Sequence, residues 1–180
     1  MKAMIIPGNG ITDISEHWFP WLKQELEKIG IEVIAKNMPD PDIARKDIWL
    51  PFIEQEIGEG DDVILIGHSS GAVAIMKYLE THKINTAVLV AGCYTDLGDE
   101  KEKKSGYYEN WKWSAIKENA KKIIQFASTN DPWISIEEAH YIRDHLNTEY
   151  YEFDNEFHFG SSHKDKLVFP ELLEALKKKL

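Results

Sequence analysis

The sequence predicts an α/β fold, a three-layer α/β/α sandwich built around a six-stranded parallel sheet. Six short apolar runs alternate with amphipathic or helix-like stretches, and this alternation is typical of βαβ units with helices on both faces of the sheet. No internal repeat, low-complexity stretch or linker divides the chain. With 180 residues and 43% hydrophobic content, the chain can form one sizeable core, so we expect a single domain over residues 1–180.

The strands are predicted where apolar runs are bounded by glycine, proline or polar turn residues. These runs are residues 3–7, 32–36, 63–67, 87–91, 122–128 and 150–153. The stretches between them fit helices at residues 16–29, 41–57, 70–81, 135–146 and 169–179. Pro20 and Pro51 lie inside two of these helices, where each marks a first turn or a kink. Residues 94–115 form one long connection without clear periodicity, and connections of that kind are often functional lids.

The composition argues against several classes of partner. A net charge of −10 repels nucleic acid backbones and anionic membrane surfaces, so we expect neither as a partner. No apolar run approaches the roughly 20 residues that span a bilayer, and the N-terminal residues predict a strand rather than a signal peptide. Cys93 is the single cysteine, which excludes an intramolecular disulfide. We therefore expect a cytoplasmic protein.

The segment Gly67-His68-Ser69-Ser70-Gly71 is the strongest chemical signal in the sequence. It joins a buried strand run to a helix of small residues, which places Ser69 on the strand-to-helix turn known as a nucleophile elbow. Gly67 and Gly71 allow the strand and the helix to approach closely. The backbone amide of Ser70 then lies at the helix N-terminus, where it can stabilise an oxyanion. The alternative is a flexible turn without a chemical role.

A serine hydroxyl needs a base, so the hypothesis requires an acid and a histidine farther along the chain. Asp131 follows the fifth predicted strand and therefore lies at the same carboxyl edge as Ser69, although an aspartate before a proline is also a good helix N-cap. His158 follows the sixth predicted strand. His163 competes for the same role, and its greater distance from the strand end favours His158.

The remaining polar signals are weaker. His68 lies inside the elbow, and we expect it to pack or hydrogen-bond locally. The other histidines lie on or beside predicted helices: His17, His82, His140 and His145. No histidine pair has metal-ligand spacing backed by carboxylates or thiols, so we expect no metal, and a serine mechanism needs no cofactor. The stretch Pro7-Gly8-Asn9-Gly10 lacks the lysine of a phosphate loop, and we expect the amide of Asn9 to be a second oxyanion donor.

Several short motifs are spread over the whole chain. They are Pro7-Gly8-Asn9-Gly10, Lys36-Asn37-Met38-Pro39-Asp40-Pro41, Ile48-Trp49-Leu50-Pro51-Phe52, Gly67 to Ala72, Asp96-Leu97-Gly98-Asp99-Glu100, Ser105-Gly106-Tyr107 and Gln125-Phe126 with Ser128. With these motifs the chain resembles the retinoblastoma-binding protein 9 family of small serine hydrolases. The resemblance implies a minimal α/β-hydrolase fold without a cap domain, a strand order of 2-1-3-4-5-6, and a catalytic triad of Ser69, Asp131 and His158.

The chain departs from the family's pattern at two places. Where the family usually shows Gly-His-Phe, this chain has Phe157-His158-Phe159, and a bulky residue before the base is expected to alter the access or orientation of the imidazole. A few extra residues, 161–165, follow it. The family's Leu-x-Cys-x-Glu type motif is replaced by Ile57-Gly58-Glu59-Gly60-Asp61, so binding of the retinoblastoma protein is not expected.

The sequence and the resemblance together predict a serine hydrolase that cleaves a small ester, thioester or amide through an acyl-enzyme on Ser69. His158 would transfer the proton, Asp131 would orient the imidazole, and the amides of Asn9 and Ser70 would bind the oxyanion. The alternative is a protein-interaction or regulatory module that retains the fold with little activity. Acyl transfer to an acceptor other than water is a third hypothesis.

The substrate itself is not fixed by these motifs. Trp111, Trp113 and Trp133 lie in segments predicted near the carboxyl edge of the sheet. They indicate either an aromatic rim around the site or ordinary packing, and the two interpretations are equally supported.

Overall fold

The strands form one parallel sheet, as predicted. The computed structural model describes residues 1–10, 12–160 and 163–178. In this part of the chain the sheet has six strands in the order β2-β1-β3-β4-β5-β6. They are β1 (Lys2–Ile6), β2 (Glu32–Ala35), β3 (Val63–His68), β4 (Ile84–Val90), β5 (Ala120–Ser128) and β6 (Glu149–Phe153). Every neighbouring pair is parallel, so all carboxyl ends meet at one edge.

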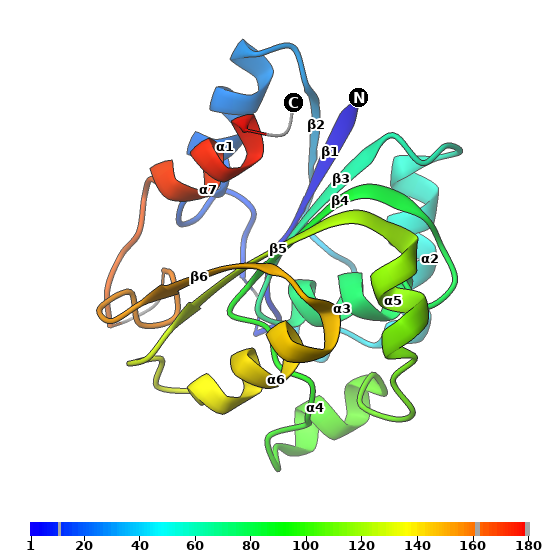
Figure 1. Cartoon of the computed structure of the whole chain (residues 1–180), viewed down its shortest axis with the longest axis vertical. Coiled ribbons are helices and arrows are strands. Elements are labelled where there is room, and N and C mark those ends of the chain that lie inside the picture. The colour runs from blue at the N-terminus through cyan, green and yellow to red at the C-terminus, as the bar shows by residue number, and fades with distance from the viewer. Residues whose placement is uncertain (11, 161–162, 179–180) are drawn as a thin grey trace.

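Helices cover both faces of the sheet and complete the three layers (Figure 1). On one face lie α1 (Phe19–Lys28) and α7 (Pro170–Lys177). On the other lie α2 (Lys46–Ile57), α3 (Ser70–Tyr78), α5 (Trp113–Asn119) and α6 (Ile136–Leu146). Successive strand residues point to opposite faces, so Leu65 packs with the second group of helices and Ile66 with the first. Both faces are apolar, which explains the continuous hydrophobic runs in the sequence.

Two helices begin later than predicted. The first begins at Phe19 rather than at residue 16, with Pro20 in its first turn. The second begins at Lys46 rather than at residue 41, because Ala44 takes a φ of 59° that lies outside the helical region. Pro51 lies within this second helix, where its ring nitrogen cannot donate to the carbonyl one turn earlier.

The connection at residues 94–115 contains helical structure that the sequence did not reveal. The helix α4 (Glu100–Ser105) begins after Asp99, whose carboxylate accepts hydrogen bonds from the amides of Lys101 (2.7 Å) and Glu102 (3.1 Å). A helix of six residues has too few turns to show a hydrophobic period. We call residues 94–112 the α4 segment. It lies beyond the carboxyl edge of the sheet (Figure 1) and packs against the layer of α2 and α3 through the fully buried Tyr107.

Candidate active site

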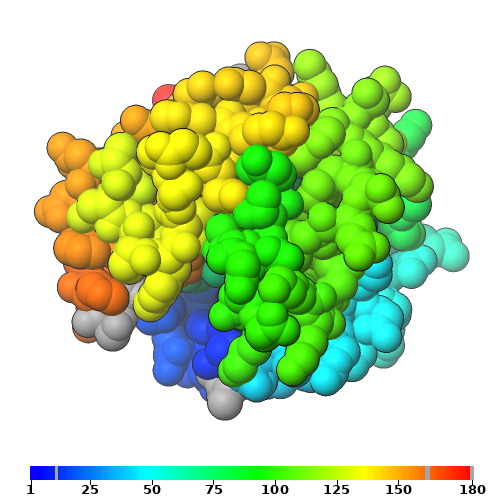
Figure 2. Space-filling view, turned by 90° about the horizontal axis from the view of Figure 1, so that it is seen from below, coloured from blue at the N-terminus to red at the C-terminus, as the bar shows by residue number. Residues whose placement is uncertain are grey.

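A cleft of about 650 Å³ opens at the carboxyl edge of the sheet. Its lining comes from the loops after β1, β5 and β6, from the turn between β3 and α3, and from the α4 segment. Seen from this edge, the green α4 segment and the yellow residues that follow β5 lie on either side of a hollow that exposes the blue N-terminal loop (Figure 2). Ligand sites of parallel α/β sheets occur at this edge, so the cleft is the candidate active site.

Ser69 lies on a sharp turn between β3 and α3. Its backbone has φ 53° and ψ −121°, a conformation that is rare for a residue with a side chain and is typical of functional sites. A Cβ added to Gly67 would lie 2.4 Å from the carbonyl carbon of Gly71, and one added to Gly71 would lie 2.3 Å from the carbonyl oxygen of Ile6. Only glycine fits at either position, so the turn has the geometry of a nucleophile elbow.

The loop after β1 passes close to the elbow. A Cβ on Gly8 would lie 3.1 Å from the Cβ of Ser69, and Asn9 lines the cleft beside the serine. Ser70 is the first residue of α3, so its amide has no acceptor within the helix. Asn9 and Ser70, whose backbone amides are predicted to bind an oxyanion, therefore both line the cleft beside Ser69.

Asp131 and His158 form a buried pair beside the cleft, which His158 lines. The Nδ1 of His158 lies 2.7 Å from Oδ2 of Asp131, and the two side chains are only 6% and 3% exposed. The other carboxylate oxygen accepts hydrogen bonds from the amides of Trp133 (2.9 Å) and Ile134 (3.1 Å). Asp131 is not the N-cap of α6, because Ser135 holds that position. The aspartate instead fixes its own loop and the imidazole together.

His158 and Ser69 line the same cleft. Among the described residues, no hydrogen bond joins the Ser69 hydroxyl to His158. Such contacts in hydrolases without substrate are often long and shorten when substrate binds.

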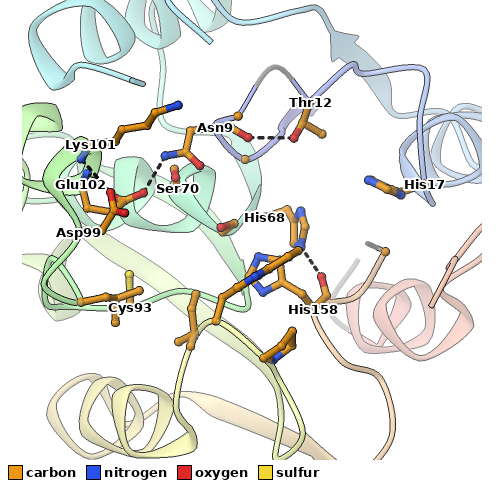
Figure 3. Close-up of a pocket in the computed structure, with 18 residues that line it drawn as sticks. Asn9, Thr12, His17, His68, Ser70, Cys93, Asp99, Lys101, Glu102 and His158 are labelled. Atoms are coloured by element: carbon orange, nitrogen blue, oxygen red, sulfur yellow. Dashed lines mark hydrogen bonds between the residues drawn. The ribbon is translucent and has the colours of Figure 1, made fainter. Parts of the chain in front are cut away.

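His68 holds the backbone at His158, which corrects the expectation of a local partner. Its Nε2 lies 2.7 Å from the carbonyl oxygen of His158, which can only accept, so Nε2 carries the proton. The two rings lie 4.8 Å apart, and Figure 3 shows this contact at the centre of the cleft. His68 is only 3% exposed. Burial, and next the nearby His158, lower the pKa of His68 well below its usual 6.5.

Phe157 precedes His158 with a φ of 47°, in the left-handed region that favours glycine. This conformation is a physical reason for a glycine at the position in related sequences. The Phe157 ring stacks on His163 with centroids 5.8 Å apart, and His158 still bonds to Asp131. The exposed ring of His163 contacts Trp133. Residues 161 and 162, part of the extra stretch, lie outside the described residues.

Of the three tryptophans considered for an aromatic rim, only Trp133 lines the cleft. Trp133 is 53% exposed, lines the cleft, and meets the ring of His158 edge-on with centroids 4.7 Å apart. Trp111 and Trp113 instead line a separate pocket of about 310 Å³. Cys93 also lines the cleft, but burial raises the pKa of its thiol. The thiol therefore stays protonated at neutral pH and does not compete as a nucleophile.

Glu102 reaches the cleft from α4, and no sequence motif predicts it as a site residue. Its carboxylate accepts a hydrogen bond of 2.6 Å from the side-chain amide of Asn9. Asp99 followed three residues later by Glu102 is a capping-box pattern, and this pattern could have predicted a helix start. It could not have predicted the contact with Asn9.

The elbow serine, the buried Asp–His pair and the parallel sheet define the class of protein: the chain is an α/β hydrolase. Residues 3–176 match the serine hydrolase family. The chain is 44% identical to serine hydrolase RBBP9 of Rattus norvegicus, over 99% of this chain and 95% of that protein. It therefore belongs to the RBBP9-like family of small serine hydrolases, as the sequence motifs predicted, and is a serine hydrolase.

Solved structures agree with this fold. The ydeN gene product of B. subtilis has a TM-score of 0.87 and 24% identity, covering 98% of this chain and 97% of that one. Est1E of Butyrivibrio proteoclasticus, solved with ferulic acid bound, has a TM-score of 0.75 and 14% identity, covering 98% and 86%. Both confirm the minimal α/β-hydrolase fold. Within residues 1–10, 12–160 and 163–178, no helix has the length and apolar character to cross a membrane.

Proposed function

We propose that the chain hydrolyses small ester, thioester or amide substrates through an acyl-enzyme formed on Ser69, with Asp131 and His158 completing the triad. The observation that carries the proposal is that the elbow serine and His158 line one cleft, with the His158 imidazole bonded to the buried Asp131. Each residue comes from a different loop, and all three loops lie at the carboxyl edge of the sheet.

The mechanism follows from the positions of these groups. The Oγ of Ser69 attacks the substrate carbonyl carbon while Nε2 of His158 takes the hydroxyl proton. Asp131 accepts the Nδ1–H hydrogen bond, which fixes the imidazole tautomer and stabilises the imidazolium. The amides of Asn9 and Ser70 bind the oxyanion of the tetrahedral intermediate. Protonation of the leaving group by His158 then leaves the acyl-enzyme, and a water activated by the same histidine releases the acid.

The cleft also limits the substrate. Its volume of about 650 Å³ lies within the range that encloses a small molecule. Leu97, Trp133 and Ile134 give it an apolar side, which suits an aliphatic or aromatic acyl group. A panel of p-nitrophenyl esters of rising chain length, with aminoacyl amides beside it, would define the preference.

The nucleophile is tested by a pair of neighbouring serines. Ser69→Ala should abolish labelling by a fluorophosphonate probe and reduce ester turnover by at least about 10³-fold. Ser70→Ala should retain most activity, because only its backbone amide is used. Thermal unfolding of both variants controls for folding. Equal labelling or equal turnover in the two variants would contradict the assignment of Ser69.

A further inference from the structure

Two acidic residues of the α4 segment line the cleft, Asp99 and Glu102, and the Asp99 carboxylate caps α4 itself. Glu102 lies in α4 and lines the cavity together with Ser69 and the loop after β1. We propose that Glu102 is a positioning residue that holds the Asn9 loop over the serine, so that the amide of Asn9 stays directed at the developing oxyanion. The inference rests on the proposed function, because it assigns a role in the same oxyanion site.

The contacts of Asn9 show why one carboxylate can fix this loop. The side-chain Nδ2 of Asn9 donates to Oε1 of Glu102 over 2.6 Å, and the carbonyl oxygen of Asn9 accepts from the Thr12 hydroxyl over 2.9 Å. Figure 3 draws both bonds. Glycines flank Asn9 on both sides, and Gly10 has a φ of 77°. Because glycine leaves the backbone free, the orientation of the Asn9 amide depends on these two contacts.

Glu102 is itself held on several sides. Its other oxygen accepts a hydrogen bond from the Tyr108 hydroxyl, which also contacts the sulfur of Cys93 at 3.6 Å. Its amide donates to the helix-capping Asp99, and its carbonyl accepts from Ser105 over 2.6 Å. A hydrogen bond to an ionised acceptor is stronger than a neutral one. The carboxylate is therefore a rigid anchor rather than a mobile surface charge.

The charge of Glu102 argues against a direct part in the chemistry. A carboxylate only accepts hydrogen bonds, so it cannot stabilise an oxyanion, and a second negative charge nearby would oppose one. Both of its oxygens are already used by neutral donors of Asn9 and Tyr108. The carboxylate instead fixes the position of the Asn9 loop. This position matters because an oxyanion donor is effective only within about 2.7–3.1 Å of the oxyanion.

The test is a double-mutant cycle between Glu102 and Asn9. Steady-state kinetics on an uncharged p-nitrophenyl ester are compared for Glu102→Ala, Asn9→Ala and the double variant. Each single change should lower kcat on the order of tenfold, less than the roughly 10²–10³-fold expected for complete loss of an oxyanion donor, while KM stays within about twofold. Because both changes release the same loop, the double variant should be no slower than the slower single one.

Conservative and matched variants complete the design. Glu102→Gln keeps an acceptor for Asn9 and should restore most of kcat, whereas Glu100→Ala on the same helix should match the wild type. Where Glu102→Ala does not fold, Tyr108→Phe provides the test, because it frees one oxygen of the carboxylate and should lower kcat without raising KM. Thermal unfolding midpoints are measured for every variant.

Three results would overturn the proposal. Multiplicative losses in the double variant would mean that the two residues act independently. A normal kcat in Glu102→Ala and Tyr108→Phe would mean that the contact only joins α4 to the loop. A rise in KM confined to a cationic ester would mean that Glu102 binds substrate charge directly. Failure of the proposed function is distinguishable, because it would appear as turnover that survives Ser69→Ala.

Discussion

Gly71 is the elbow position with the least room for a side chain, so Gly71→Ala is a quantitative test of the site. A Cβ at residue 71 would lie 2.3 Å from the carbonyl oxygen of Ile6 and 2.8 Å from that of Pro7. Ordinary contacts of this kind are longer than 3 Å, and the blocking atoms are backbone at the end of β1, which is paired with a strand on each side and cannot rotate away. The helix must therefore move away from the strand.

The expected cost has two parts. Overpacking of a well-packed interior costs about 1–3 kcal/mol, and we expect the upper end because backbone must move. Folding stabilities are about 5–15 kcal/mol, so the variant should still fold. A displacement of about 1 Å at the adjacent Ser69 should reduce kcat/KM by about 10²-fold.

The control is a glycine whose substitution strains only the backbone. Gly30 has a φ of +84° and nothing within 4 Å of an added Cβ, so Gly30→Ala should cost about 1–2 kcal/mol and leave kcat/KM unchanged. Urea unfolding measures stability, and ester hydrolysis measures kcat/KM. If Gly71→Ala proved no less stable than Gly30→Ala and kept full activity, the steric account of the elbow would be wrong.

Three further predictions concern the histidines and the acid. The pKa of buried His68 is lowered in the folded state, so below pH about 6.5 the unfolded chain binds a proton that the folded chain does not, and the free energy of unfolding falls by at most about 1.4 kcal/mol per pH unit. When urea unfolding is measured from pH 7.5 to 5, the free energy of unfolding should depend less steeply on pH in His68→Asn than in the wild type. An identical dependence in the two proteins would refute this. Asp131→Asn should lower kcat by about 10⁴-fold, measured on a p-nitrophenyl ester, and a loss below tenfold would argue against its orienting role. Turnover should be lost in His158→Ala and kept in His163→Ala, and the reverse result would move the base to the extra residues.

Local patterns were enough to predict the layers and the elbow. Each strand is a short apolar run and each long helix has an amphipathic period, so the six strands were found from short windows. The elbow was predictable for the same reason: Gly67, Ser69 and Gly71 lie within five residues of sequence, and the two glycines allow the strand and the helix to meet. The strand ends also placed Asp131 and His158 at one edge.

The resemblance to a family added the strand order, which periodicity could not supply. Periodicity reports which face of an element is buried, but it does not report which element lies beside which. The short helix α4 escaped detection because six residues contain no repeat to detect.

The tertiary structure alone decided how the loops meet above the sheet. His68 contacts the carbonyl of His158 across 90 positions of sequence, and Asn9 contacts Glu102 across 93. No local pattern encodes such pairs, because each depends on the path of two separate loops and on the packing that brings their ends together. The sequence by itself thus determined which residues lie at the carboxyl edge, and the three-dimensional packing decided which of them touch.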